Sequence, residues 1–170
     1  MPVVHFCRQR PREQPKNYVS SLIRADALVR KFGQEWDDRR VIDLATAAEA
    51  ATESPHPRAA GLLAELEATA DRQVAAWLAL DGPGPRPPAV GLVTLVTSGP
   101  AERQRHSISW LLVHPAARRR GIGRLLVEHA CGHAWARAAD RVWVECRADW
   151  TTAIDFWRAM GFSSAGSAPG

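Results

Sequence analysis

Residues 108–124 read Ile-Ser-Trp-Leu-Leu-Val-His-Pro-Ala-Ala-Arg-Arg-Arg-Gly-Ile-Gly-Arg. The apolar first half predicts a strand, and Pro115 ends it because proline lacks the N–H that a strand ladder needs. After three arginines, the Gly-Ile-Gly run opens a predicted helix whose apolar residues fall on one side. A basic, glycine-bearing loop before a helix favours an anion, since the first N–H groups of a helix have no internal partner.

The segments on either side of this stretch predict a mixed, mostly antiparallel sheet. Strand-like runs at 73–80 and 89–97 enclose the glycine- and proline-rich residues 81–88, which favours an antiparallel hairpin. Further along, a helix, a strand and a helix are expected at 122–138, 142–146 and 151–160. A strand that returns through a helix to a neighbouring strand is a parallel crossover. We therefore expect an α/β protein of the α+β type, with helices on both faces of the sheet.

The N-terminal part of the chain carries weaker signals. A short strand is expected at 3–6, followed by helices at 17–32, 41–52 and 60–70. Neither a repeat nor a break in composition divides the sequence, so a single domain over 1–170 is expected. Its motif-bearing core spans about 72–163, and a largely helical region spans about 10–71.

Composition narrows the class of protein. The chain has 170 residues, of which 46% are hydrophobic, so it can bury a core and is not a disordered chain. Its 22 basic and 18 acidic residues give a net charge of +4, which favours an anionic ligand without implying nucleic acid. Neither a signal peptide nor an apolar run long enough to span a membrane is visible. We expect a cytoplasmic protein that binds neither nucleic acid nor membrane.

The cysteines and histidines predict neither a disulfide framework nor a metal site. Cys7, Cys131 and Cys146 are scattered and suit a reducing compartment. His129 and His133 share a helix face, but Cys131 lies away from both, so the three cannot converge on one ion. Cys146 has no activating group beside it in sequence and is expected to be a buried, inert thiol.

Three features taken together resemble the GCN5-related N-acetyltransferases. They are Val113-His-Pro, the loop Arg118-Arg-Arg-Gly-Ile-Gly, and the later run Phe156-Trp-Arg-Ala-Met-Gly-Phe. The pyrophosphate loop of that family reads Arg/Gln-x-x-Gly-x-Gly/Ala. A nucleotide-binding P-loop does not fit, because no Gly-Lys-Ser/Thr follows, and a dinucleotide fingerprint lacks its third glycine here.

The resemblance implies acetyl-CoA, or a related acyl-CoA, as the co-substrate. It places the pyrophosphate on the backbone amides of the loop and helix start, and the pantetheine along Val113, where the strand diverges from the next parallel strand. It also makes 10–71 the acceptor side of the fold. The implied cofactor-binding residues are Val113, Arg118, Arg119, Arg120, Gly121, Ile122, Gly123, Arg124 and Trp150.

Two tryptophans depart from the family pattern. Trp150 stands where the family usually has an asparagine, and Trp157 stands where it often has a tyrosine that protonates the leaving thiolate. An indole N–H donates a hydrogen bond but supplies no proton at useful pH. Trp157 is therefore a candidate for orienting the sulfur or for packing, and not for acid catalysis.

An amine acceptor also needs a general base, because an ammonium must lose a proton before it attacks. Glu145 is the carboxylate that the resemblance places nearest the cleft, and Asp149 is the second candidate. A solvated surface role is open for both of them.

The predicted function is N-acetyl transfer from acetyl-CoA to an amine of a small molecule or protein, by direct attack in a ternary complex. The alternative is a non-catalytic acyl-CoA-binding module. A monomer or a homodimer fits equally well. After Phe162 only eight residues remain, and we expect the C-terminal strand pair of the family to be shortened. The sheet is then shorter, completed by a partner chain, or short of one wall of the acceptor site.

Overall fold

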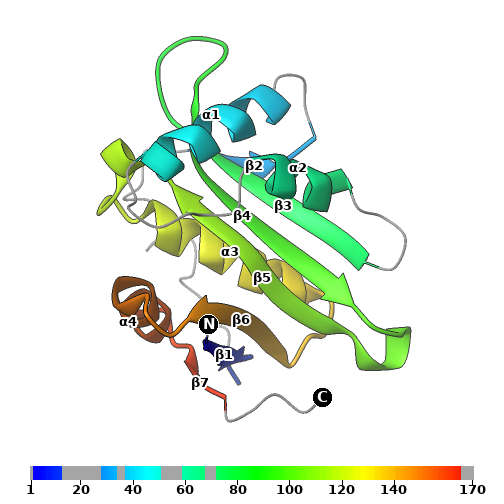
Figure 1. The fold of residues 1–170 in the computed structure, drawn as a ribbon. Helices are drawn as coiled ribbons and strands as arrows, with labels where there is room; N and C mark the ends of the chain where they lie inside the picture. The colour runs from blue at the N-terminus through cyan, green and yellow to red at the C-terminus, as the bar shows by residue number, and fades with distance from the viewer. Residues whose placement is uncertain (1, 13–27, 34–36, 51–58, 68–71, 166–170) are drawn as a thin grey trace.

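The computed structural model describes residues 2–12, 28–33, 37–50, 59–67 and 72–165, which form one seven-stranded sheet with helices on both faces (Figure 1). The strands, in the spatial order β2-β3-β4-β5-β6-β1-β7, are β1 Val3–Gln9, β2 Leu28–Lys31, β3 Arg72–Leu80, β4 Ala89–Ser98, β5 Arg105–Val113, β6 Arg141–Arg147 and β7 Ser163–Ser164. The α-helices are α1 Asp37–Ala50, α2 Ala59–Glu67, α3 Ile122–Ala136 and α4 Thr151–Ala159. Two 3-10 helices, η1 Ala101–Arg103 and η2 Pro115–Ala117, lie in the loops beside β5. None of the described helices has the length and apolar composition that a membrane crossing requires.

The expected sheet is confirmed over the second half of the chain. Strands β3, β4 and β5 form an antiparallel meander, and α3 carries the chain over to β6, which runs parallel to β5. The observed strands and helices keep the predicted order and differ from the predicted bounds by one or two residues. Apolar periodicity is strong in these segments, and their glycine and proline turns are unambiguous.

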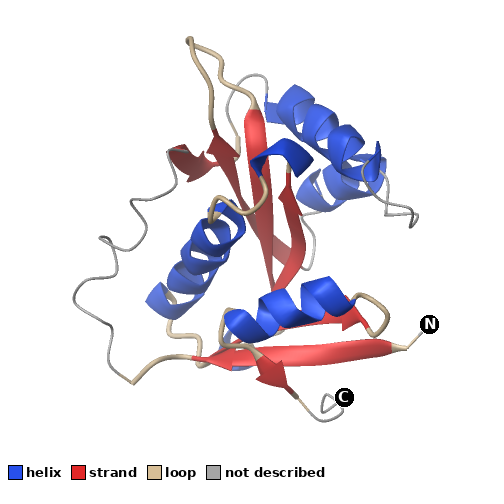
Figure 2. Ribbon diagram, turned by 90° about the vertical axis from the view of Figure 1, so that its left-hand side faces the viewer, coloured by secondary structure: helices blue, strands red, loops and turns tan. Residues whose placement is uncertain are grey.

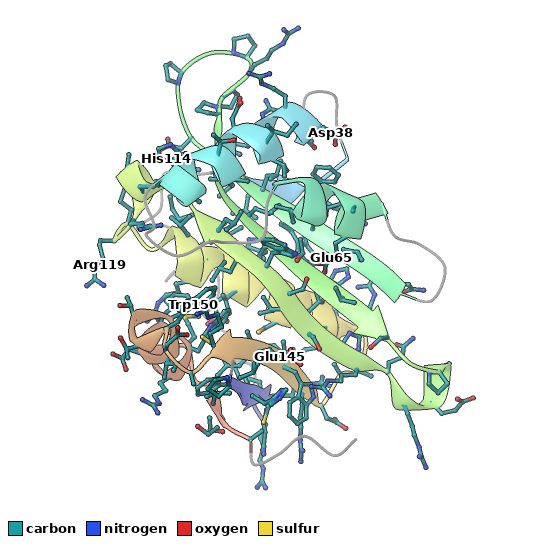
Figure 3. The ribbon with its side chains drawn as sticks, viewed as in Figure 1. Asp38, Glu65, His114, Arg119, Glu145 and Trp150 are labelled. Atoms are coloured by element: carbon teal, nitrogen blue, oxygen red, sulfur yellow. The ribbon has the colours of Figure 1, made fainter. Side chains whose placement is uncertain are left out.

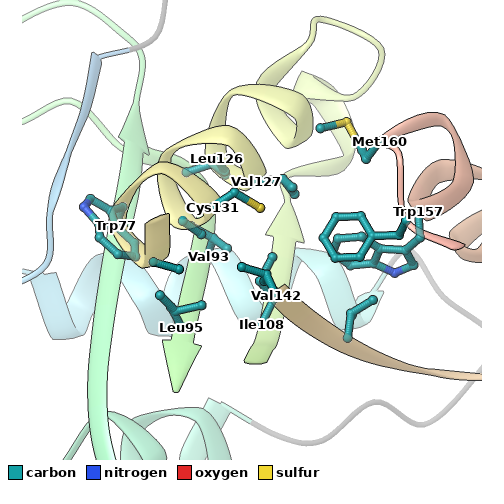
Figure 4. Close-up of a cluster of buried hydrophobic side chains, with 14 of the residues drawn as sticks. Trp77, Val93, Leu95, Ile108, Leu126, Val127, Cys131, Val142, Trp157 and Met160 are labelled. Atoms are coloured by element: carbon teal, nitrogen blue, oxygen red, sulfur yellow. The ribbon is translucent and has the colours of Figure 1, made fainter. Parts of the chain in front are cut away.

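Each face of the sheet has its own core. Helices α3 and α4 cover one face, where side chains such as Leu126, Val142 and Trp157 join one buried cluster (Figure 4). Helices α1 and α2 cover β2 to β5 on the other face, around Leu44 and Leu62 (Figure 1). The alternation of β6 follows from this arrangement, because its even-numbered residues are buried under α3 and α4 and its odd-numbered residues point to the opposite face.

The prediction of a helix over 17–32 is wrong at its C-terminal end. Leu28–Lys31 is a strand that pairs antiparallel with β3, and residues 17–27 lie outside the described ranges. Pairing with the sheet edge overrides helical spacing in this short segment, because strand formation depends on the neighbouring strand more than on local propensity. Helix α1 also begins at Asp37, earlier than the predicted 41. The Asp37 carboxylate accepts a hydrogen bond from the Gly33 N–H at 2.9 Å, just before the helix.

Two strands from opposite ends of the described chain extend the sheet beyond β6. Strand β1 pairs antiparallel with β6 over seven residues, from Val3 opposite Arg147 to Gln9 opposite Arg141. The short β7 then adds to the outer edge of β1, with Ser163 opposite Cys7 (Figure 2). The short strand expected at 3–6 therefore exists and is longer. Within the described residues, which end at 165, the C-terminal strand has two residues and pairs with β1.

Cys131 and His133 of α3 pack against neighbouring side chains of the fold. Burial raises the pKa of the Cys131 thiol to about 12, so it is uncharged at neutral pH. His133 packs edge-on against Trp77 with ring centroids 4.8 Å apart, whereas His129 is exposed. Within the described ranges, no group of three or more His, Cys, Asp or Glu side chains lies close enough to hold a metal ion.

Candidate functional site

A gap between two parallel strands forms the centre of the candidate site. Strands β5 and β6 pair only from His106 opposite Val142 to Ile108 opposite Val144. Beyond Ile108 the two strands diverge, although β5 continues to Val113 and β6 to Arg147. The register of β5 against β4 shifts at the same place, because Leu95 pairs with Ile108 and Thr94 with Trp110, which leaves Ser109 as a bulge.

Thr94 holds the bulge in place. Its side chain is fully buried, and its Oγ1 accepts a hydrogen bond from the Trp110 backbone N–H at 3.0 Å. The same hydroxyl lies 2.6 Å from the Ser109 Oγ, so one buried side chain satisfies both polar groups that the bulge displaces. The divergence of β5 from β6 thus begins at a hydrogen-bonded irregularity.

The backbone of β5 presents polar groups to the gap. The His114 N–H donates to the Val90 carbonyl at 2.8 Å, which fixes the alternation of the ladder between β4 and β5. In an antiparallel pair, every second residue turns its N–H and C=O away from its neighbour. Leu111 and Val113 are those residues here, so their backbone groups face the gap that β6 leaves. That Val113 binds pantetheine stays a prediction.

The N-terminus of α3 adjoins the same end of β5. Gly121 precedes the helix with φ of 82°, and the first helical hydrogen bond runs from the Leu125 N–H to the Gly121 carbonyl at 3.0 Å. The N–H groups of Ile122, Gly123 and Arg124 therefore come before any internal partner. A side chain at Gly121 would project into open space, so the glycine is required by its left-handed backbone and not by crowding.

The arginines of the loop differ in their partners. Arg120 forms an ion pair with Asp81, at the end of β3, with Nη1 and Oδ2 2.8 Å apart. Arg118, Arg119 and Arg124 are exposed, and Arg119 extends outward beside the helix start (Figure 3). Arg120 is thus already partly neutralised, and it joins the loop to the β3–β4 turn.

Gly123 lets three elements meet at this end of the gap. A methyl group at Gly123 would lie 3.3 Å from the Phe156 ring of α4 and 3.7 Å from a Val113 methyl group. Those distances leave little room for any side chain at position 123. The first turn of α3 is therefore packed directly against α4 and the end of β5.

Glu145 lies just past the last pair between β5 and β6, on the face opposite α3 and α4. Its side chain is 64% exposed, and its Oε1 is 3.5 Å from Nδ1 of His5, the residue opposite it on β1. The other base candidate, Asp149, is held by Arg147 through contacts of 3.0 and 2.6 Å. These hydrogen bonds keep the pKa of Asp149 below its usual range, which weakens it as a base.

The two unusual tryptophans occupy different surroundings. Trp150 is half-buried at the start of α4, and the Arg147 guanidinium lies 5.3 Å from the centre of its ring. Trp157 is only 6% exposed and packs edge-on against both Phe156 and Phe162, each with ring centroids 5.2 Å away. These contacts favour packing as the role of Trp157. Burial raises the pKa of the nearby Cys146 thiol, which suits the inert residue expected there.

One carboxylate beside the site was not singled out from the sequence. Glu65 of α2 accepts a hydrogen bond from the Trp110 indole N–H at 2.6 Å (Figure 3). Trp110 directly follows the bulge, so this bond brings α2 to the start of the gap. The sequence carries no signal for it, because 45 residues separate the two side chains and no local motif contains Glu65.

Parts of this chain match known acetyltransferases. A stretch that is 39% identical over 66 residues matches the streptothricin acetyltransferase of Streptomyces lavendulae, covering 39% of this chain and 35% of that protein. Another, 36% identical over 55 residues, matches the [ribosomal protein bS18]-alanine N-acetyltransferase of Salmonella typhimurium, covering 32% and 37%. The matched stretches thus span only about a third of either relative's length.

Solved structures share the fold at low sequence identity. A putative acetyltransferase from Pyrococcus furiosus superposes with a TM-score of 0.64 at 17% identity, over 85% of this chain and 98% of that one. The NatC complex, bound to a Gag peptide and CoA, gives a TM-score of 0.63 at 18% identity, over 82% and 86%. The model of the acetyltransferase (GNAT) family matches residues 30–162, which is most of the sequence. The chain belongs to the acetyltransferase (GNAT) family.

Proposed function

We propose that this protein is an N-acetyltransferase that uses acetyl-CoA as the acyl donor and an amine as the acceptor. The observation that carries the proposal is the junction of the β5–β6 gap with the N-terminus of α3. An extended chain that ends in a pyrophosphate needs both features side by side. The gap offers strand-like hydrogen bonding, and the helix offers N–H donors to a diphosphate.

The donor would be held mainly by the backbone. The groups of Leu111 and Val113 that face the gap suit the amides of pantetheine, and the first N–H groups of α3 suit the pyrophosphate. Arg118 and Arg119 add positive charge at the open side of the loop. Each charge-assisted hydrogen bond in such a site contributes about 1.5–3 kcal/mol.

In the proposed transfer, Glu145 accepts a proton from the acceptor ammonium, directly or through one water molecule. The neutral nitrogen attacks the thioester carbonyl, so a C–N bond forms, the C–S bond breaks and CoA leaves as its thiolate. The second proton that nitrogen loses passes through water to that thiolate. A thiol with a pKa of about 8.5 is a tolerable leaving group, so the step does not require an acid at Trp157.

A second candidate function is a non-catalytic module that binds acyl-CoA. The observation that favours it is the burial of Trp157 among aromatic rings, which leaves no proton donor at the position where the family often has a tyrosine. Binding of the donor is common to both candidates, and only turnover separates them.

Calorimetric titration with acetyl-CoA tests the site that both candidates need. Gly121→Glu should weaken binding at least about tenfold, because a carboxylate would face the pyrophosphate. Gly121→Ala carries the same backbone strain without the charge and should bind more tightly than Gly121→Glu. Gly132→Glu places the same charge further along α3, where a side chain meets open space, and serves as the control. Unchanged binding by Gly121→Glu would contradict the proposed pyrophosphate site.

Thiol release in the presence of a panel of primary amines then tests turnover. Acetyl-CoA-dependent release with at least one amine, together with acetylated product detected by mass spectrometry, supports the acetyltransferase. Tight donor binding with no product across the panel favours the binding module.

A further inference from the structure

The contact between Glu65 and Trp110 places a carboxylate on the acceptor side of the site. The indole N–H donates to Oε2 at 2.6 Å, which fixes the rotamers of both side chains. Glu65 is half-buried on α2, beside an apolar cluster to which Leu66 and Leu112 contribute. Among the residues that the structure describes, no lysine or arginine forms an ion pair with Glu65.

Glu65 and Glu145 stand on opposite sides of the gap. Trp110 is the first β5 residue after the bulge and joins the apolar cluster under α1 and α2. Glu145 is the first β6 residue after the last pair, and its side chain points to the same face of the sheet (Figure 3). An acceptor that enters from this face therefore passes between two carboxylates.

We propose that Glu65, positioned by the Trp110 indole, binds a cationic group of the acceptor other than the amine that is acetylated. The preferred acceptors are then small amines with two or more cationic groups. This inference rests on the proposed acetyl transfer, and it adds the class of acceptor and the residue that selects it.

The position of Glu65 suits a second cation better than the reacting nitrogen. The reacting nitrogen must approach the thioester carbon to about 3–3.5 Å, close to the β5 backbone at the gap. The length of an indole side chain separates the Glu65 carboxylate from that backbone. A diamine spans such a separation, with one nitrogen at each end.

The surroundings favour attraction over solvation. A carboxylate beside apolar side chains interacts with a cation more strongly than one in bulk water, because the local dielectric is lower. The indole hydrogen bond occupies Oε2, and Oε1 has no partner among the described residues. The Glu65 carboxylate is thus held in one position, and its negative charge is complementary to a cationic group of the substrate.

Matched pairs of acceptors test the inference in the intact protein. Each unbranched diamine of three to six carbons is compared with the monoamine of equal length, for example 1,5-diaminopentane with pentylamine. We expect kcat/KM to be about 10- to 100-fold higher for the best diamine, as one charge-assisted contact allows. Glu65→Gln keeps an oxygen that can accept the indole hydrogen bond but removes the charge. It should abolish the preference by raising KM for the diamine, with kcat little changed.

The controls separate recognition from folding. Trp110→Phe keeps an aromatic ring but frees Glu65, and it should lower the diamine preference by less than Glu65→Gln does. Asp38→Asn removes an exposed charge from α1 at a distance from the gap and should leave the preference unchanged (Figure 3). Thermal unfolding and acetyl-CoA affinity should be similar in all three variants.

Two outcomes would overturn the inference while leaving the acetyl transfer intact: equal kcat/KM for diamines and monoamines, or a Glu65→Gln variant that keeps the preference. If no amine is acetylated, the proposed function fails. Calorimetric titration of the CoA-bound protein with the paired amines then still measures whether Glu65 contributes to diamine affinity. Tighter diamine binding that Glu65→Gln removes would then support the site, and equal binding would refute it.

Discussion

The buried hydroxyl of Thr94 shows how one side chain shapes the candidate site. By accepting from the Trp110 N–H and contacting the Ser109 hydroxyl, it makes the bulge a satisfied, ordered feature. Without such a partner, a displaced backbone N–H in the interior would cost about 1–3 kcal/mol. The Trp110 side chain, which directly follows the bulge, bonds to Glu65. Thr94 lies on β4, outside the gap, and by holding the bulge it influences which side chains lie at the edge of the gap.

At the residue scale, Glu145→Gln tests the proposed base. Because the amide cannot take a proton from the acceptor, kcat should fall by about 10²- to 10⁴-fold, with the affinity for acetyl-CoA unchanged. The acidic limb of the kcat/KM profile against pH should flatten as well. Steady-state kinetics between pH 5 and 9 provide the measurement.

Two matched variants accompany that experiment. Asp149→Asn removes the carboxylate that Arg147 already holds, and it should lower kcat much less. Glu102→Gln alters an exposed charge in η1 and should be neutral. A Glu145→Gln variant with the turnover and pH profile of the unmodified protein would show that the base is another group.

At the scale of elements, two glycines let α3 pack closely against its neighbours. Gly91 of β4 lets the helix lie against the sheet, since a methyl group there would be 2.7 Å from Leu126 Cδ1 and 2.9 Å from Ile122 Cγ2. Gly123, on the helix itself, admits Phe156 of α4. The N–H groups at the start of α3 are therefore positioned by close packing against β4 and α4.

Gly91→Ala should push α3 away from β4. We expect a loss of about 1–3 kcal/mol in the free energy of unfolding, because overpacking a well-packed contact forces side chains and backbone to shift. Acetyl-CoA affinity should fall too, since the helix start moves relative to β5. Denaturant unfolding and calorimetry measure the two effects.

The matched control lies on the same helix. Gly132→Ala meets nothing within 4 Å and should stabilise the protein by up to about 1 kcal/mol, as alanine is the better helix former. Equal stability of the two variants would show that the contact at Gly91 does not set the position of α3.

Most elements of the motif-bearing core were predictable from sequence, and several features around it were not. Pro115, Gly121 and the apolar runs beside them are local signals, and they place β5, the loop and α3 correctly. Strand β2 was predicted as a helix because its pairing with β3 is not encoded in its own four residues. Glu65 was missed for the same reason, since its contact with Trp110 arises only from tertiary packing.

At the scale of the whole molecule, β1 joins the two ends of the described chain in one half of the sheet. It lies between β6 and β7 (Figure 2). The Arg8 side chain of β1 also contacts α3. The Arg8 guanidinium is 3.0 Å from the Glu128 carboxylate and 5.1 Å from the centre of the Trp135 ring. These contacts tie the strand to the helix that carries the proposed pyrophosphate site.

Arg8→Met should therefore destabilise the protein. It leaves the Glu128 carboxylate, which is only 12% exposed, without its ionic partner, and the expected loss is about 3 kcal/mol. Arg8→Met combined with Glu128→Leu should recover much of that loss, because no unpaired charge remains. Chemical denaturation of the single and double variants gives the coupling free energy.

Arg39→Met is the comparison, because the pair between Arg39 and Asp43 is 72% and 61% exposed. Such surface pairs contribute about 0–1 kcal/mol. If Arg8→Met cost no more than Arg39→Met, β1 would not depend on this ion pair for its place in the fold.

The place of β1 in the sheet also sets an order of events during synthesis. Val3 pairs with Arg147, so β1 is synthesised long before β6, the strand that it pairs with over seven residues. Until β6 is synthesised, the nascent chain can form the β3–β5 meander, but β1 remains an apolar segment with an open edge, a state prone to intermolecular pairing. Such a distant pairing also lowers the rate of folding, because a long loop must close first. Closure of this half of the sheet is therefore a late step, reached only after the loop at 118–121 and α3 have been synthesised.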